Sequence, residues 1–156
     1  MALLLEIPGW RRLELHHLVL DLNGTLAVDG RPQKGVVKAL AKLKGIVACH
    51  LVTADTFGTA GGLFGDLVRL AIIGPGREAE QKLALVQALG AENVAAVGNG
   101  ANDVLMLKAA ALGICVLGLE GANPAALAAA DVVAPGPVAA LELLLRPDRL
   151  RATLRR

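Results

Sequence analysis

The stretch that decides the fold is Leu18-Val19-Leu20-Asp21-Leu22-Asn23-Gly24-Thr25, an apolar run that ends on a carboxylate and enters a turn. The pattern is typical of a buried strand, and Asp21 falls at its carboxyl end, where open α/β sheets bind ligands. Another apolar run enters a polar turn and then a helix at Val97-Gly98-Asn99-Gly100-Ala101-Asn102-Asp103. The two turns can face one site.

Outside these turns, short β-rich runs alternate with helical patterns. We expect strands at 13–21, 46–53, 68–73, 94–98, 114–117 and 131–133, and helices at 34–44, 56–67, 77–89, 102–112, 124–130 and 138–145. This alternation predicts a three-layer α/β fold with a mostly parallel sheet and helices on both faces. Residues 22–32 are too short and Gly-rich for a crossover helix, which favours a small hairpin or flap with its turn at Asp29-Gly30.

The composition favours one folded domain, residues 1–156, with a solvated basic tail at about 147–156. A chain of this length buries about 70% of the surface that its unfolded form exposes. Hydrophobic residues make up 54% of the chain and charged residues 19%, which argues against disorder. The net charge of +2 and the scarcity of aromatic residues (2%) argue against a nucleic-acid partner.

The sequence also predicts a protein of the cytoplasm with no membrane partner. The longest uncharged stretch, residues 109–119, is well short of the roughly 18 apolar residues that suggest a membrane span. Cys49 and Cys115 both lie in apolar runs, which favours buried, reduced thiols over a secretory disulfide framework.

The residue types at the strand ends suggest phosphoryl chemistry. A strand-end carboxylate such as Asp21, backed by Gly-containing turns, can attack phosphorus or bind a hard cation. Asp103 would add a second carboxylate and Asn99 a neutral oxygen ligand. Thr53 could hold a phosphoryl oxygen, and Lys82 could neutralise charge on the transferring group.

Each of these residues also has an ordinary structural interpretation. Asp21 can form an Asx-type turn, and Asn102 and Asp103 can cap their helix. Thr53 can be a plain strand residue and Lys82 a solvated helix residue. Their order along the chain, each at a strand end or in the helix that follows, favours the functional interpretation.

These motifs resemble those of the haloacid dehalogenase superfamily, and within it the phosphorylation domain of P-type ATPases and their small soluble relatives. Asp21-Leu22-Asn23-Gly24-Thr25 looks like the first motif, Leu51-Val52-Thr53-Ala54-Asp55 the second, Lys82 the third and Gly98-Asn99-Gly100-Ala101-Asn102-Asp103 the fourth. The resemblance implies a Rossmann-like sheet, Mg²⁺ as cofactor and an aspartyl-phosphate on Asp21.

From this resemblance we expect three sets of site residues. The catalytic set is Asp21, Asn23, Thr53 and Lys82. The substrate-binding set is Leu22, Gly24, Thr25, Ala54, Asp55 and Asn102. The metal-binding set is Asp21, Asn23 (through its backbone carbonyl), Asn99 and Asp103.

The chain departs from the family pattern at Asn23 and Asn99. Phosphatases of this superfamily carry an acid-base Asp two residues after the nucleophile, and an amide cannot deliver a proton at neutral pH. Loss of such a group typically costs about 10²- to 10⁴-fold in rate. Asn99 replaces a magnesium-binding Asp, so we expect weaker metal affinity. Without an acid, hydrolysis should favour acyl phosphates, aryl phosphates or nucleotide polyphosphates, whose leaving groups depart unprotonated.

The spacing leaves no room for the lid domain of many family members. Only 32 positions separate Asp21 from Thr53, and 29 separate Thr53 from Lys82. We therefore expect a capless protein, open to a phosphorylated small molecule or a phosphoprotein, that can form homo-oligomers. The function that we expect is a weak or selective phosphohydrolase. The alternatives are a phosphotransferase and a catalytically impaired sensor of phosphate ligands or assembly partner.

Overall fold

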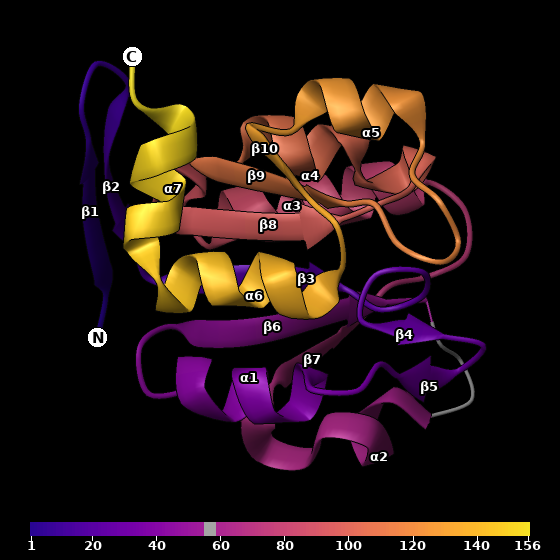
Figure 1. Cartoon of the computed structure of the whole chain (residues 1–156). Coiled ribbons are helices and arrows are strands. Elements are labelled where there is room, and N and C mark those ends of the chain that lie inside the picture. Colours follow the sequence, from indigo (N-terminus) through magenta and orange to yellow (C-terminus); the bar gives the residue numbers. More distant parts are fainter. Residues whose placement is uncertain (55–58) are drawn as a thin grey trace.

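The computed structural model describes residues 1–54 and 59–156, without the side chains of 59–61. Its centre is a parallel sheet with the strand order β10-β9-β8-β3-β6-β7 (Figure 1). The strands are β3 (His17–Asp21), β6 (Ala48–Thr53), β7 (Arg69–Ile72), β8 (Val94–Gly98), β9 (Leu112–Val116) and β10 (Val132–Ala134). The predicted α/β architecture is confirmed, and the central strand β3 carries Asp21.

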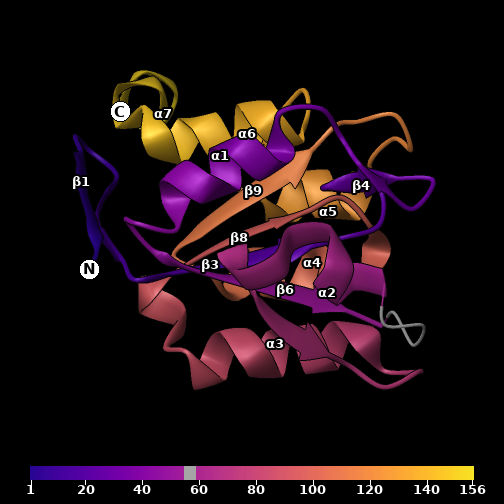
Figure 2. The ribbon, with the colours of Figure 1, turned by 90° about the horizontal axis from the view of Figure 1, so that it is seen from below.

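Helices cover both faces of this sheet (Figure 2). α1 (Val36–Leu43) and α6 (Pro137–Leu145) cover one face, and α3 (Glu78–Ala88), α4 (Val104–Ala109) and α5 (Pro124–Ala129) cover the other. α2 (Thr59–Phe64) and the 3-10 turns η1 (Gly65–Leu67), η2 (Ala91–Asn93) and η3 (Ala101–Asp103) lie in the connections. Alternate residues of β3 enter two cores: Leu18 and Leu20 pack with Leu40 of α1, and Val19 packs with Val86 of α3.

A short hairpin follows Asp21 and forms the predicted flap. Its strands are β4 (Ala27–Val28) and β5 (Arg31–Pro32). Asp29 and Gly30 both have positive φ, 52° and 76°, as both central residues of a type I′ hairpin turn require. Between Asp21 and Thr53, the chain forms this flap, α1 and β6. In the described part of the chain, neither gap between the motifs contains a cap domain.

The N-terminal segment differs from the prediction. The expected strand 13–21 is two strands, because β2 (Arg11–Leu15) ends before His16 and pairs with β1 (Leu3–Ile7), a strand that was not predicted. The backbone N–H of His16 instead donates to the carbonyl of Asn93 (2.9 Å), and the chain then enters the parallel sheet. The β1–β2 hairpin lies at the end of the molecule opposite the flap (Figure 1).

The C-terminal segment also corrects the prediction of a solvated basic tail. Residues Pro147–Leu154 form helix α7, whose Leu150 is fully buried. The Arg151 side chain donates to the Glu6 carbonyl (3.1 Å), and the N–H of Arg156 donates to the Pro8 carbonyl (2.9 Å). The tail is therefore a packed helix that covers the N-terminal hairpin.

The helix expected at 102–112 is shorter than predicted. It is the turn η3 followed by α4, which ends at Ala109, because Leu112 and Gly113 pair with β8 as the start of β9. A Cβ atom on Gly113 would lie 2.4 Å from the Leu107 carbonyl oxygen, so the close return of the chain requires glycine here.

Two further expectations can be compared with the structure. Cys49 and Cys115 are buried and unbridged, as predicted. None of the helices in residues 1–54 and 59–156 has the length and apolar character needed to cross a bilayer.

Candidate functional site

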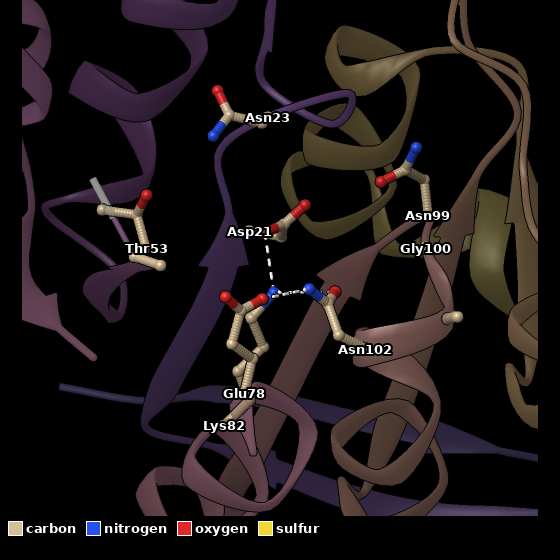
Figure 3. A pocket seen from close by; sticks show the side chains of 10 residues that line it. Asp21, Asn23, Thr53, Glu78, Lys82, Asn99, Gly100 and Asn102 are labelled. Atoms are coloured by element: carbon tan, nitrogen blue, oxygen red, sulfur yellow. Dashed lines mark hydrogen bonds and ion pairs between the residues drawn. The ribbon is translucent and has the colours of Figure 1, made fainter. Parts of the chain in front are cut away.

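Three neighbouring strands bring the predicted motifs to one edge of the sheet. Asp21 is the last residue of β3, Thr53 the last of β6 and Gly98 the last of β8. Because β3 pairs in parallel with both β6 and β8, these carboxyl ends lie side by side. Figure 3 shows Thr53 and Asn99 on opposite sides of Asp21. The predicted convergence of the motifs is confirmed.

A buried cluster of three charged side chains lies at this edge. The Nζ atom of Lys82 is 2.9 Å from Asp21 Oδ1 and 2.8 Å from Asp103 Oδ1. The relative exposures are 2% for Lys82, 8% for Asp21 and 0% for Asp103. One ammonium thus bridges two carboxylates, and the cluster carries a net charge of −1 when all three groups are ionised.

Burial and the neighbouring charges shift the pKa values in this cluster. Burial raises the pKa of Asp21, the Asp103 carboxylate raises it further, and Lys82 and the Thr25 hydroxyl offset part of the rise, which leaves it at about 6. Burial alone would lower the pKa of Lys82, but the two carboxylates outweigh it and raise this pKa. Asp21 is therefore mostly a carboxylate at neutral pH, and a divalent cation beside it would favour that form further.

The second oxygen of Asp21 is held by the turn that follows it. The hydroxyl of Thr25 lies 3.0 Å from Asp21 Oδ2 and 3.1 Å from Asn99 Oδ1, so its proton can be donated to either. The Asn99 amide nitrogen donates to the Gly121 carbonyl (3.3 Å), which turns the amide oxygen toward Thr25 and Asp21. Gly24 has a φ of 76°, and a Cβ atom there would lie 2.7 Å from Asn99 Nδ2. Gly24 thus lets Asn99 approach the first motif.

The side chain of Asp103 lies beneath the site and is held there by backbone N–H groups. Its Oδ2 atom accepts hydrogen bonds from the backbone N–H groups of Asn99 and Gly100, both at 3.0 Å. A Cβ atom on Gly98 would lie 2.5 Å from Asp103 Cγ, so only glycine leaves room for this carboxyl group. With Oδ1 on Lys82, both Asp103 oxygens are held by protein donors, and its side chain is 0% exposed, against 11% for that of Asp21. This geometry is that of a residue that positions Lys82, and it does not favour the predicted direct contact of Asp103 with a metal.

Helix α3 supplies Lys82 and is anchored by a residue that the sequence prediction missed. The Gln81 amide nitrogen donates to the carbonyls of Gly74 (3.0 Å) and Gly76 (2.8 Å), and its Oε1 accepts the N–H of Gly74 (2.9 Å). These bonds tie the loop before α3 to the helix. Gln81 therefore fixes the start of the helix that carries Lys82.

Glu78 is a second residue of α3 that the prediction missed. Its Oε2 atom accepts a hydrogen bond from Asn102 Nδ2 (2.8 Å), and Asn102 Oδ1 accepts one from Lys82 Nζ (3.1 Å). Glu78 and Lys82 are four residues apart, which places them on one face of the helix. This i, i+4 spacing of Glu and Lys was the only signal in the sequence.

A cavity of about 410 Å³ opens above the cluster. Its described lining combines the motif residues with Glu78 and consists of Asp21, Asn23, Thr53, Ala54, Glu78, Lys82, Asn99, Gly100, Ala101 and Asn102. Most of the predicted site residues therefore lie in one cavity.

Four predicted site residues do not line this cavity, and one lies outside the described residues. Asp103 is below it, and Gly24 supports Asn99. Leu22 packs its side chain in the core, so only its backbone can contact a ligand. Thr25 is fully buried and holds Asp21. Asp55 belongs to the residues that the structure does not describe.

The donor atoms at the cavity suit a hard cation that binds weakly. In residues 1–54 and 59–156, no group of three or more His, Cys, Asp or Glu side chains is arranged to hold a metal ion. The oxygens that the structure places there are the Asp21 carboxylate and the Asn99 amide oxygen turned toward it, and Asn23, whose backbone carbonyl is expected to add a third, also lines the cavity. Mg²⁺ accepts such oxygen ligands and retains several waters, so the site fits Mg²⁺ with one carboxylate instead of several.

Comparisons with known proteins agree with this geometry. The model of the haloacid dehalogenase-like hydrolase family matches residues 3–111. The uncharacterized protein MJ0073 of Methanocaldococcus jannaschii is 45% identical over 84 residues, which cover 51% of this chain and 90% of that protein. The phosphoserine phosphatase of Idiomarina loihiensis is 41% identical over 95 residues, which cover 61% of this chain but only 40% of that protein.

Solved structures show the same fold at low sequence identity. The cobalt-bound deoxy-D-mannose-octulosonate 8-phosphate phosphatase of Haemophilus influenzae superposes with a TM-score of 0.69 at 16% identity, and the match covers 85% of this chain and 88% of that one. The 3-deoxy-D-manno-octulosonate 8-phosphate phosphatase of Moraxella catarrhalis, in complex with magnesium, phosphate and its KDO ligand, gives a TM-score of 0.66 at 17% identity, with coverages of 90% and 94%. The narrower resemblance to P-type ATPases stays a prediction. On the match of the family model over residues 3–111, the chain belongs to the haloacid dehalogenase-like hydrolases.

Proposed function

We propose that the protein is a Mg²⁺-dependent phosphohydrolase that forms an aspartyl-phosphate on Asp21. The observation that carries the proposal is the placement of Asp21. It stands at the carboxyl end of the central strand, faces a cavity of about 410 Å³, and is held by an ammonium on Oδ1 and a hydroxyl on Oδ2. A carboxylate with both oxygens oriented in this way is prepared for attack on phosphorus.

The residues around Asp21 bind the phosphoryl group and balance its charge during the reaction. A carboxylate oxygen of Asp21 attacks phosphorus, the new O–P bond forms, and the bond from phosphorus to the leaving oxygen breaks. Lys82 balances the negative charge, and Thr53 and Asn102, which line the same cavity, hold phosphoryl oxygens through the hydroxyl and the amide. Water then attacks the phosphorus of the aspartyl-phosphate, the bond from phosphorus to the Asp21 oxygen breaks, and inorganic phosphate, which takes up the protons of the water, leaves Asp21 as a carboxylate. Mg²⁺, held by Asp21, Asn99 and the Asn23 carbonyl, would neutralise charge on the phosphoryl group.

Asn23 determines which leaving groups can depart. It lines the cavity, but its amide cannot donate a proton to a leaving alkoxide as a carboxylic acid would. Groups that leave as stable anions need no such proton. We therefore expect acyl and aryl phosphates to react faster than alkyl phosphates, and the aspartyl-phosphate to hydrolyse slowly.

The relatives support a substrate of small-molecule size. The phosphoserine phosphatase and the octulosonate 8-phosphate phosphatases act, by their names, on phosphorylated small molecules. We extend this substrate class to the present chain, as a capless single domain that can form homo-oligomers. A catalytically impaired sensor is less favoured, because the Asp21–Lys82–Asp103 cluster is complete and faces an open cavity.

Steady-state turnover of 4-nitrophenyl phosphate and an alkyl phosphate, with and without Mg²⁺, tests the proposal. We expect Mg²⁺-dependent hydrolysis of the aryl ester that Asp21→Asn abolishes. Asp66→Asn is the matched control, because Asp66 is an exposed aspartate that pairs with Lys44 at the surface and does not line the cavity. Aryl phosphate hydrolysis that survives in the folded Asp21→Asn variant would refute the assignment of the nucleophile.

A further inference from the structure

Glu78 is a charged residue of the cavity wall that the proposed chemistry does not use. It lies in the first turn of α3 and lines the cavity, and its Oε2 atom accepts a hydrogen bond from the amide of Asn102. No basic side chain of the described residues forms an ion pair with it. In Figure 3 its side chain extends from α3 alongside Lys82.

The described cavity lining has no spare positive charge to offset Glu78. Lys82 is the one basic residue among the described lining residues, and Asp21, Asp103 and Asn102 already occupy its ammonium group. A substrate therefore meets positive charge from Lys82 and a metal at its phosphoryl group, and negative charge from Glu78 on the wall.

We propose that Glu78 selects substrates by the charge of the leaving group, so that the enzyme accepts phosphate esters whose leaving groups are neutral or cationic and rejects anionic ones. The proposal rests on the proposed function. It narrows the substrate class, because nucleotide polyphosphates and carboxylated sugar phosphates have anionic leaving groups that find no counter-ion among the lining residues that the structure describes. A phosphate ester whose leaving group carries an ammonium, or an aryl or acyl phosphate whose leaving group carries no added charge, meets no such repulsion.

The size of the effect follows from Coulomb's law at a wet cavity wall. In bulk water, a unit charge about 4 Å from a second charge changes a binding or rate constant by about fivefold. The change is larger where the dielectric constant is lower. For a half-buried carboxylate, we expect at least about tenfold between cationic and anionic substrates. Salt should reduce this ratio, since the Debye length is about 10 Å at 0.1 M ionic strength.

A purely structural role for Glu78 makes a different prediction. If Glu78 only holds Asn102 in place, its oxygen matters and its charge does not. Glu78→Gln keeps an amide oxygen that can accept the hydrogen bond from Asn102 and removes the charge. The variant therefore separates selection by charge from positioning.

The experiment compares three aryl phosphates of matched reactivity: 4-methylphenyl, 4-(aminomethyl)phenyl and 4-(carboxymethyl)phenyl phosphate. The methylene group insulates the phenol from the added charge, so the leaving groups stay similar. We expect the ratio of kcat/KM for the cationic over the anionic ester to fall at least about tenfold in Glu78→Gln, with the neutral ester as the common reference. The control is Glu80→Gln, an exposed glutamate two residues further along α3 that does not line the cavity, and it should leave the ratio unchanged.

Three other results would overturn the selection by charge. They are an unchanged ratio in Glu78→Gln, an equal loss on all three esters, which indicates positioning of Asn102, and an equal shift in Glu80→Gln, which indicates the overall charge of the helix. The failure of the proposed function looks different, because then no ester is hydrolysed in an Asp21-dependent way. Wild-type turnover of the neutral ester therefore keeps the two hypotheses apart.

Discussion

Removing the charge of Lys82 should destabilise the protein to an extent that depends on pH and on Mg²⁺. Lys82 Nζ lies within 3 Å of a carboxylate oxygen on both Asp21 and Asp103, and all three side chains are buried. Lys82→Met keeps a long apolar side chain and deletes the ammonium. Two buried carboxylates then face each other without a cation.

The expected loss follows from the burial of the cluster. Breaking a buried ion pair by removing one partner costs about 3–5 kcal/mol. For a chain of this size, each kcal/mol lowers Tm by about 2–4 °C. Lys82→Met should therefore lower Tm by about 6–20 °C at pH 8 without metal.

The pH dependence has a definite sign. The folded-state pKa of Asp21 is about 6, above its ordinary value of 3.8, and it should rise further once Lys82 no longer lowers it. An acid whose folded-state pKa is raised destabilises the fold when it ionises, so the penalty grows as pH rises from about 4 and is complete above the folded-state pKa. The stability difference between variant and wild type should therefore shrink from pH 8 to pH 5. Mg²⁺ should shrink it as well.

Urea unfolding followed by circular dichroism at pH 5 and pH 8, with and without Mg²⁺, measures this difference. Lys38→Met is the control, because Lys38 is exposed on α1 and its loss should change the free energy of unfolding by less than about 0.5 kcal/mol. If Lys82→Met loses the same stability at both pH values and Mg²⁺ has no effect, Lys82 supports the fold by packing and not by its charge.

Three further predictions concern the acid-base position, the support of Asp103 and a buried histidine. Asn23→Asp should raise turnover of alkyl phosphates by about 10²-fold or more and shorten the lifetime of the phosphoenzyme, whereas equal alkyl rates would place Asn23 outside the acid-base position. Gly98→Ala should lower stability by about 1–3 kcal/mol and slow turnover in the protein that remains folded, because the new methyl group displaces Asp103; unchanged turnover would contradict this. Burial, followed by the charge of His17, lowers the pKa of His50 to about 4. The free energy of unfolding should therefore fall by about 3 kcal/mol as pH drops from 6.5 to 4. His50→Gln should flatten that part of a curve of unfolding free energy against pH.

The central fold could be predicted because its signals are local. β8 begins and ends where the apolar run 94–98 does, and the flap turns at Asp29-Gly30, where positive φ values select such residues. Parallel strands that alternate with helices leave few possible topologies. The motifs at the strand ends therefore converge on one site.

The two ends of the chain could not be predicted because each depends on the other. β1 alternates buried and exposed residues, but its apolar run is short and its partner β2 was merged with β3. In α7, the only apolar signal in the sequence is the i, i+4 spacing of Leu150 and Leu154, and the surrounding arginines make the segment look like a solvated tail. The helix is stabilised by the hairpin on which it packs, and no local pattern shows that contact.

Within the site, the missed residues are those whose roles arise between elements. Glu78 and Gln81 resemble ordinary polar residues of a helix until α3 is placed beside η3 and the preceding loop. The sequence predicts Asp103 as a metal ligand, whereas its burial below Lys82 depends on the missing side chain of Gly98. A sequence pattern identifies the polar side chains of a site but does not show which of them line the cavity.

Intact-mass measurement after incubation with acetyl phosphate and Mg²⁺ tests most directly whether Asp21 is the nucleophile. We predict a metal-dependent gain of one phosphoryl group in the wild type, a longer lifetime of the adduct than in Asn23→Asp, and no adduct in Asp21→Ala. A beryllofluoride complex formed by the wild type, and absent in Asp21→Ala, would show that the variant lacks the acceptor carboxylate. An equal phosphoryl gain in Asp21→Ala, or no gain together with no turnover of an aryl phosphate by the wild type, would contradict a nucleophilic Asp21.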